Sequence, residues 1–444
     1  MDKTLLEHIN IVFIGHVDAG KSTTCGQILC LTGMVDTRTL EKYQKEANEH
    51  GQADCSAAYV TDVDEEERER NITIDIGRAY FSTTKKRYTI LDAPGHKMYV
   101  PNMINGVSQA DVAILLIPAR KGEFESGFEK NGQTKEHALL ARSLGVKKLV
   151  VAINKMDDQT VNWDQNRFDN IKTSVWKYLR DTGFQLKDIT FIPISGFTGM
   201  NIKESVPKEI CPWNTSQPLL EILDSMLPFE RLNEKPLRIP VLDKIREEGK
   251  MMILGKIETG ILKLGDEIVC HPNNIKMQVY QIMNNDLNLE IAKPGENLKI
   301  YVKMNFSEEE YISKGNMITH SKNQCTVTSD FVAKIYIREL TENVKIFSEG
   351  AQCVIHLGLI TEEIKISKLL EKIDNRGKII EKLPKFVLQN SFVIAHITFS
   401  KAQCIEKFDD FERLGLFVLR NEGKTIGLGK IISTNAPKLV KRTK

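Results

Sequence analysis

Residues 15–22 combine glycine, lysine and serine in the spacing of a phosphate-binding loop, Gly-His-Val-Asp-Ala-Gly-Lys-Ser. An apolar run at residues 9–14 precedes the loop and a helical pattern begins near Lys21, so the motif lies where a strand turns into a helix. Glycine lets the backbone approach phosphate oxygens, and the N–H groups at the start of a helix attract negative charge. Lys21 supplies a positive charge for the phosphates and Ser22 an oxygen for Mg²⁺. We therefore expect nucleotide contacts from His16, Val17, Asp18, Ala19, Gly20, Lys21, Ser22 and Thr23.

A second motif, Asn-Lys-Met-Asp at residues 154–157, follows the apolar run 149–153 and is suited to choosing the base. Ligands of α/β proteins bind at the carboxyl ends of the strands, where this motif is placed. Asp157 can accept two hydrogen bonds from N1–H and the 2-amino group of guanine, and adenine lacks this pair of donors. Lys155 would lie along the base, and Asn154 would tie this loop to the phosphate loop. Another apolar run ends at residue 194, and we expect the segment after it, Ser195, Gly196 and Phe197, to close over the guanine.

A third motif, Asp-Ala-Pro-Gly-His at residues 92–96, follows the apolar run 88–91. We expect Asp92 to hold Mg²⁺, through a water molecule. Gly95 can offer its N–H to the terminal phosphate, and a glycine lets the backbone flip when that phosphate leaves. The sequence therefore predicts a nucleotide-dependent switch at this segment.

Strands that alternate with helices must position these motifs. Apolar runs recur up to residue 194, and helical patterns lie between several of them, most clearly at residues 133–144 and 166–179. This alternation predicts a mostly parallel sheet with helices on both faces, an α/β phosphate-loop domain covering residues 1–227.

The texture of the sequence changes after Pro228. Residues 228–236 are polar and bracketed by prolines, which indicates a linker. Beyond them, short strand-like runs are separated by glycine and aspartate, as in small antiparallel β-barrels. We expect one β-barrel domain at residues 237–323 and a second at residues 324–444.

Composition excludes several classes of protein. The chain has 444 residues, 41% of them hydrophobic, which suits a globular protein of two or three domains. Its 61 Lys and Arg against 59 Asp and Glu leave a net charge of +2, so bulk charge does not bind nucleic acid. Eight cysteines without a Cys-x-x-Cys pair indicate neither a disulfide framework nor a zinc site. Without a signal stretch or a long apolar run, we expect a soluble cytoplasmic protein that binds no membrane.

The order of these motifs resembles that of the translational GTPases related to elongation factor Tu and elongation factor 1-alpha. The resemblance implies that His96 orients or polarises the water that attacks GTP once the ribosome pushes it into place. It also implies that Thr73, within the switch segment 67–75, completes the Mg²⁺ shell beside Ser22 and Asp92. Asn71 stands where elongation factors carry glycine, and asparagine is the next most tolerant residue for a left-handed turn.

Within this family the chain most resembles the GTPase subunit of the eukaryotic peptide chain release factor. That resemblance implies a factor, monomeric outside its complex, that binds the stop-codon-reading release factor through the C-terminal β-domains. It would deliver this partner to the ribosome and hydrolyse GTP to promote peptide release. The segments that carry the resemblance are residues 31–36, 38–43, 77–81, 99–104, 119–125, 156–158, 161–163 and 419–426.

Some segments depart from the release-factor pattern. Residues 70–75 and 131–134 are closer to elongation factor 1-alpha, and Leu416 replaces an arginine that the branch uses against its partner. The first strand begins by Ile9, so we expect functions housed in the family's long N-terminal extension to be absent. The alternatives are an elongation factor 1-alpha-like carrier of aminoacyl-tRNA, a ribosome-rescue GTPase, and a GTP-dependent scaffold without hydrolysis. The presence of His96, Thr73 and Lys21 argues against the scaffold.

Overall fold

The chain is divided into two compact units in the computed structural model. One comprises Met1–Arg142 and Val146–Phe229, and the other comprises Ser143–Gly145 and Glu230–Lys444. The structure describes residues 6–434 apart from 37, 40, 41, 43, 44, 46–72, 74, 130, 131, 248 and 286. Asn71, Asn131 and most of the first switch segment therefore lie outside the described residues. The division after Phe229 falls inside the segment predicted as a linker.

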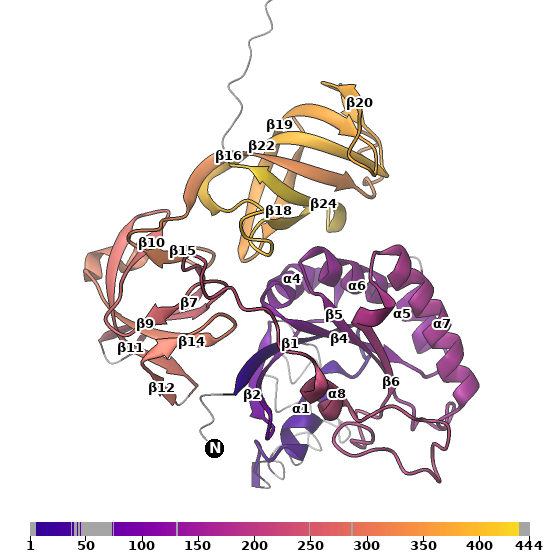
Figure 1. Cartoon of the computed structure of the whole chain (residues 1–444). Helices are drawn as coiled ribbons and strands as arrows, with labels where there is room; N and C mark the ends of the chain where they lie inside the picture. The colour runs from indigo at the N-terminus through magenta and orange to yellow at the C-terminus, as the bar shows by residue number, and fades with distance from the viewer. Residues whose placement is uncertain are drawn as a thin grey trace, which may run out of the picture. The chain divides into compact units, whose positions relative to one another are not determined.

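The first unit is built on a six-stranded sheet (Figure 1). Its strand order is β2-β3-β1-β4-β5-β6, and every neighbouring pair is parallel except β2 with β3. The strands β3 and β4 are buried along their whole lengths, as expected for strands covered on both faces. The strand bounds are β1 Glu7–Gly15, β2 Gly77–Ser82, β3 Lys86–Asp92, β4 Val112–Pro118, β5 Lys148–Asn154 and β6 Ile189–Pro193.

Helices cover both faces of this sheet (Figure 1). On one face, α1 and α8 contribute Ile28 and Leu223 to a core that also contains Phe13 and Ile114 of the sheet. On the other face lie α4, α6 and α7, whose apolar stripes are buried. The helix bounds are α1 Lys21–Leu31, α4 Val100–Gln109, α5 Glu123–Phe128, α6 Gln133–Ser143, α7 Gln165–Asp181 and α8 Leu219–Ser225, with short 3₁₀ helices η4 Lys97–Tyr99 and η5 Leu186–Asp188.

The second unit begins with a closed β-barrel. Its strand order is β10-β15-β7-β8-β14-β11, and the pairing of β10 with β11 closes the ring. The side chains that fill it include Ile253, Ile268 and Ile300. Its elements are β7 Ile239–Glu247, β8 Lys250–Lys256, β9 Leu262–Lys263, β10 Glu267–His271, β11 Ile275–Asn284, β12 Leu287–Leu289, β13 Ile291–Ala292, β14 Asn297–Lys303, η6 Phe306–Tyr311 and β15 Met317–His320.

A second barrel follows in the same unit. The ring β18-β23-β24-β16-β22-β19 is closed by β18 with β19, and β20 adds an edge strand to β19 outside the ring. Phe331, Ile397 and Phe417 lie in its core. Its strands are β16 Thr326–Ile337, β17 Phe347–Ser348, β18 Gln352–Leu357, β19 Ile360–Ile373, β20 Ile379–Lys382, β21 Phe386–Val387, β22 Ser391–Ile405, β23 Leu416–Asn421 and β24 Lys424–Ser433.

An ion pair joins the two barrels. Arg238, just before β7, donates from Nε to Glu406 Oε1 at 2.5 Å, and both side chains are buried. The same guanidinium donates to the carbonyls of Asn323 and Gln324, and it lies 4.9 Å from the centre of the Phe411 ring. Removing one partner would leave the other charged and buried, so this pair holds the barrels together.

The predicted fold class is confirmed: an α/β phosphate-loop domain precedes two antiparallel barrels. The seven cysteines among the described residues are free, and all but Cys30 are buried. The described part of the chain contains no helix long and apolar enough to cross a membrane.

Candidate nucleotide site

The phosphate loop leaves β1 through an unusual backbone conformation. Gly15 has φ of +151° and Gly20, the residue before α1, has φ of +86°, values that suit glycine. A Cβ at Gly15 would collide with the carbonyl oxygen of Leu116 in the neighbouring strand. The loop therefore curls tightly between strand and helix, as its sequence predicts.

Lys21 lies inside this loop. Its ammonium group donates to the carbonyl oxygen of His16 at 2.9 Å, and the side chain is buried. Burial lowers the pKa of Lys21, while the carboxylates of Asp92 and Asp18 act in the opposite direction. A phosphate group would add negative charge beside the ammonium and favour its charged form.

The switch segment begins against the phosphate loop. β3 ends at Asp92, which is fully buried. A Cβ at Gly95 would collide with Lys21 Nζ and would lie 3.1 Å from both His16 O and Val17 N. Only glycine fits here without displacement, so the backbone of the switch and that of the loop are in direct apposition.

The three side chains expected to hold magnesium, Ser22, Thr73 and Asp92, all carry oxygen atoms. Ser22 Oγ at the start of α1 lies 3.1 Å from Thr73 Oγ1, although the two residues are far apart in the sequence. Two hydroxyls with the carboxylate of Asp92 are the hard oxygen donors that Mg²⁺ prefers, usually with water in its remaining positions. The described residues contain no group of three or more His, Cys, Asp or Glu that could hold a metal ion by themselves.

His96 lies at the start of the 3₁₀ helix η4 and is partly exposed. Its Nδ1 accepts a hydrogen bond from the Met98 N–H at 3.3 Å, and its ring centre is 5.9 Å from that of Tyr99. The ring follows directly after Gly95, which touches the phosphate loop. This placement is compatible with a side chain that acts on water near the phosphates.

The base-recognition motif is tied to its neighbours by Asn154. This buried side chain donates from Nδ2 to Ala19 O at 2.9 Å and accepts from the Gly196 N–H at 2.7 Å. One amide thus joins the phosphate loop, the end of β5 and the loop after β6. A Cβ at Gly196 would collide with Thr24 Oγ1 of α1, so this junction is also closely packed.

The other residues expected to contact the base are more exposed. Lys155 has φ of +61°, and its Nζ lies 2.8 Å from Glu123 Oε2. Asp157 is half-buried, and no hydrogen bond links its carboxylate to another described residue. Phe197 is 58% exposed. The loop therefore offers an open carboxylate and an open aromatic ring at the edge of the sheet.

A network of charges that sequence reasoning missed supports this loop. Arg120 Nε lies 3.3 Å from Asp158 Oδ2, beside the contact between Lys155 and Glu123. Arg167 of α7 pairs with Glu125 at 2.8 Å, and its hydrogen bonds lower the pKa of Glu125 to about 2. The segment 119–125, expected from the release-factor resemblance, thus supports the base loop through these ion pairs. The opposite charges at 120, 123 and 125 were the only available hint in the sequence.

Two further residues missed by sequence reasoning lie on α6. His137 is buried, and its Nδ1 accepts from the Gly15 N–H at 3.1 Å. Burial, the first cause, lowers the pKa of His137 to about 3, and the charge of Lys21 acts in the same direction. Gln133, one helical turn earlier, lies beside His16 and Gly95. Their spacing of four residues on one helix face could have indicated a shared target.

Comparison with known proteins agrees with this geometry. Residues 6–229 match the model of the elongation factor Tu GTP binding domain. The chain belongs to the elongation factor Tu GTP-binding family. Residues 330–432 in addition match the GTP-eEF1A C-terminal domain-like family. The family resemblance predicted from the order of the nucleotide-site motifs is therefore confirmed.

Among members of this family, the chain is similar to eukaryotic peptide chain release factor GTP-binding subunits. It is 44% identical to that of Kluyveromyces lactis over 96% of this chain and 60% of the relative. It is 42% identical to that of Schizosaccharomyces pombe over 96% of this chain and 64% of the relative. The chain thus spans somewhat less than two thirds of the length of these relatives.

A solved structure shares the fold. The Ski7 GTPase-like domain of S. cerevisiae, described as bound to GTP, has a TM-score of 0.79 at 18% identity. The match covers 96% of this chain and 97% of that domain. At this low identity the likeness concerns the fold alone.

Proposed function

We propose that this chain is the GTPase subunit of a translation termination complex. It binds GTP with Mg²⁺, carries the stop-codon-reading release factor to the ribosome and hydrolyses GTP to promote peptide release. The observation that supports the proposal is the close packing of the phosphate loop, the switch and the base loop in a chain 44% identical to a release-factor GTP-binding subunit. We place this activity in the cytoplasm and expect a monomer outside the complex.

Hydrolysis would use the residues gathered around the phosphate loop. Lys21 and the N–H groups of residues 16–23 bind the phosphates, and Gly95 offers its N–H to the terminal phosphate. Ser22, Thr73 and Asp92 would hold Mg²⁺, and the bound ion would neutralise phosphate charge. His96 orients or polarises the attacking water when the ribosome repositions the switch, so chemistry depends on positioning and charge.

Selection of guanine would rest on the base loop. Asp157 accepts from N1–H and the 2-amino group, while Lys155 lies along the ring. Asn154 keeps this loop at a fixed distance from the phosphate loop through its bond to Ala19. Ser195, Gly196 and Phe197 cover the remaining side of the base.

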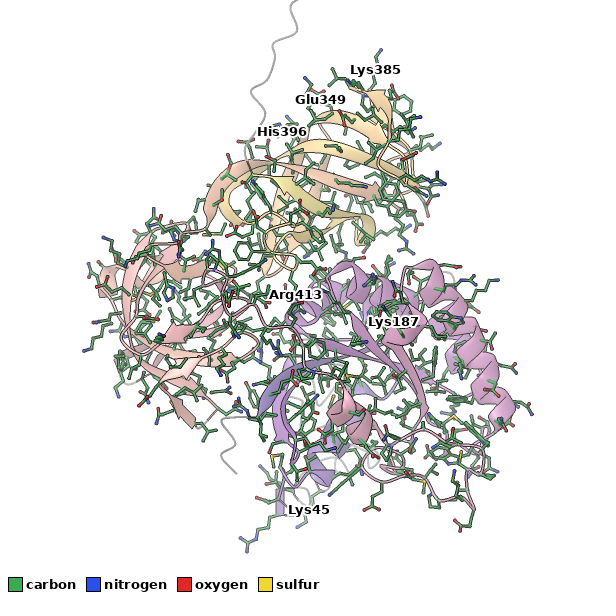
Figure 2. The ribbon with its side chains drawn as sticks, viewed as in Figure 1. Lys45, Lys187, Glu349, Lys385, His396 and Arg413 are labelled. Carbon is green, nitrogen blue, oxygen red and sulfur yellow. The ribbon has the colours of Figure 1, made fainter. Side chains whose placement is uncertain are left out.

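The last barrel offers a surface suited to a protein partner. The edge strand β20 and the segment after it expose five large apolar side chains, by 42% to 61% each. These five side chains lie within ten residues of one another in the sequence, which favours this edge segment as a place of contact with another protein. Lys385, labelled in Figure 2, lies within this segment. We propose that the stop-codon-reading factor contacts this patch, formed by Ile379, Ile380, Leu383, Phe386 and Leu388.

An aminoacyl-tRNA carrier is the second candidate. It is favoured by the sequence at residues 70–75 and 131–134, which resembles elongation factor 1-alpha, and by the match of residues 330–432 to the GTP-eEF1A C-terminal domain-like family. Leu416, the first residue of β23, stands where the release-factor branch has an arginine that contacts its partner, and this departure also favours the second candidate. A carrier of tRNA would depend on a local basic surface, since the net charge is only +2.

A pull-down with the GTP-loaded chain separates the two candidates. We expect recovery of a stop-codon-reading protein from cytosol, and recovery of aminoacyl-tRNA alone would contradict the proposal. Ile380→Asp, in the exposed patch, should reduce the recovery. Leu287→Asp, at an exposed strand position of the other barrel, is the matched control and should leave recovery unchanged.

A further inference from the structure

Gln133 connects the switch to the phosphate loop. It is the first residue of α6, and its carboxamide lies 2.8 Å from Gly95 O, 2.8 Å from Lys97 N and 2.7 Å from His16 Nδ1. A carbonyl oxygen can only accept and a backbone N–H can only donate, which fixes the orientation of the amide. Nε2 therefore faces Gly95 O and His16 Nδ1, while Oε1 accepts from the Lys97 N–H.

Two of these bonds hold the backbone on both sides of His96. The Gly95 carbonyl belongs to the peptide group before His96 Cα, and the Lys97 N–H belongs to the peptide group after it. His96 has φ of −80° and ψ of 141°, and these angles describe how the two groups are turned. One carboxamide that binds both groups therefore restrains the direction in which the imidazole leaves the backbone.

The third bond anchors the carboxamide to the phosphate loop. Because Gln133 Nε2 donates to it, His16 Nδ1 must carry no proton, so His16 is the neutral tautomer protonated at Nε2. Burial is the main cause that lowers the pKa of His16, which favours the neutral ring. The His16 side chain also packs on Gly127 of α5, where an added Cβ would lie 3.2 Å from His16 Cβ.

α6 is a firm support for this bridge. His137, four residues after Gln133, accepts the N–H of Gly15 on the same helix face. α6 thus contacts the first two residues of the phosphate loop, Gly15 and His16. Its other buried side chains fix the helix on the sheet: Thr134, Ala138, Leu139, Leu140 and Ala141.

We propose that Gln133 is a positioning residue for GTP hydrolysis. It ties the peptide groups on both sides of His96 to the phosphate loop, and through them it directs the imidazole towards the attacking water. This inference rests on the proposed role of His96. Gln133 would set how fast bound GTP is hydrolysed and would leave the selection and affinity of the nucleotide to the base loop.

Gln133→Met tests the inference because it keeps the length of the side chain and removes all three hydrogen bonds. We expect ribosome-stimulated single-turnover hydrolysis to slow by about 10- to 10²-fold, since small errors in position are costly in catalysis. Dissociation constants for GDP and GTP should change less than about threefold. Gln217→Met is the matched control, because Gln217 is an exposed residue ahead of α8 whose side chain donates to Glu221. This variant should hydrolyse GTP at the normal rate.

A double variant separates positioning from a general structural role. If Gln133 acts through His96, then adding Gln133→Met to His96→Ala should slow GTP hydrolysis little further. The reason is that the effects of two substitutions on the rate do not add when the two residues act as a unit. Unchanged turnover in Gln133→Met would overturn the inference. A full additional loss in the double variant would also overturn it.

Failure of the proposed function would look different. It would appear in the unaltered protein, as hydrolysis that ribosomes with the stop-codon-reading factor do not stimulate. The unaltered protein, Gln133→Met, His96→Ala and the double variant would then be compared by unstimulated hydrolysis. A slower rate in Gln133→Met that is absent from the His96→Ala background would support the inference, and equal rates would overturn it.

Discussion

The two halves of the nucleotide site are built differently: the base half, residues 154–157 and 195–197, and the phosphate half, residues 15–22 with the switch segments at Thr73 and 92–96. In the base half, the buried amide of Asn154 joins three segments by hydrogen bonds to Ala19 O and from Gly196 N. In the phosphate half, Gly95 packs on the backbone of the loop, and several of the other links between segments are partly exposed polar side chains. Thr73 meets Ser22 through hydroxyl groups, and Gln133 spans His16 and the backbone beside His96.

This difference indicates which half can change its conformation when a nucleotide or a partner binds. Because the buried amide of Asn154 has hydrogen-bond partners on both sides, breaking its bonds costs free energy. We therefore expect the base half to keep one conformation when guanine binds and leaves. Polar bridges near the surface exchange partners at small cost, so the phosphate half can change with the nucleotide or with a partner. We therefore expect substitutions in the base half to alter binding or folding, and those in the phosphate half to alter hydrolysis.

The largest effect is expected from Asp157→Asn. The amide can donate to the 2-oxo group of xanthine, whereas it no longer accepts both donors of guanine. The preference for GTP over the xanthine nucleotide should shift by about 10⁴-fold, as for sites built around specific hydrogen bonds. Competition binding with labelled GDP measures this shift. Equal affinity of the unaltered protein for ATP and GTP would show that the base half does not select guanine.

His96→Ala should show the opposite pattern in the phosphate half. The imidazole acts on water and not on the phosphates, so GTP and GDP affinities should be kept. Ribosome-stimulated hydrolysis should fall by about 10²-fold or more, the contribution of a positioned catalytic group. Single-turnover assays with labelled GTP provide the rate. If stimulated turnover survives the substitution, another group orients the water.

Asn154→Ala should destabilise the first unit. It leaves the Ala19 carbonyl and the Gly196 N–H without their partner, at a cost of about 2 kcal/mol in the free energy of unfolding. All three tryptophans, Trp163, Trp176 and Trp213, belong to this unit, so their fluorescence in urea reports its unfolding alone. Asn166→Ala, at an exposed position in α7, is the control. If both variants unfolded at the same urea concentration, the hydrogen bonds of Asn154 would not stabilise the base half in the free protein.

The smallest effect is expected from Glu123→Gln. The ion pair with Lys155 is about 30% exposed on each side and is screened by water. Its loss should weaken GTP and GDP binding alike, by about twofold to fivefold. Glu221→Gln, an exposed change on α8, should leave binding unchanged. A loss confined to GTP would place Glu123 with the phosphate half instead.

Local patterns made most of the first unit predictable from the sequence. The strand, loop and helix around residues 15–22 lie together in the chain, so their order alone defines the motif. The helix expected at 133–144 ends at Ser143, just before Gly145, whose φ of +90° suits a helix end. The barrels were likewise indicated by short strands between turn residues, although the sequence could not show which strands close each ring.

Long-range contacts were beyond such patterns. The antiparallel edge strand β2 was not predicted, since its pairing with β3 depends on a neighbour outside its own segment. The bridges from α6 to the phosphate loop join residues about a hundred positions apart, and periodicity explains Gln133 and His137 only as helix residues. Their roles depend on where the sheet places the helix.

A protein partner should act on the phosphate half of this site. A partner that prefers the GTP state must, by linkage, raise the affinity for GTP. The decisive measurement is a titration of GTP at fixed Mg²⁺, alone, with the stop-codon-reading factor, and with aminoacyl-tRNA. We predict tighter GTP binding with the protein factor alone and no change for GDP. Tightening only with aminoacyl-tRNA would contradict the account and assign the chain to the elongation factor 1-alpha type of carrier.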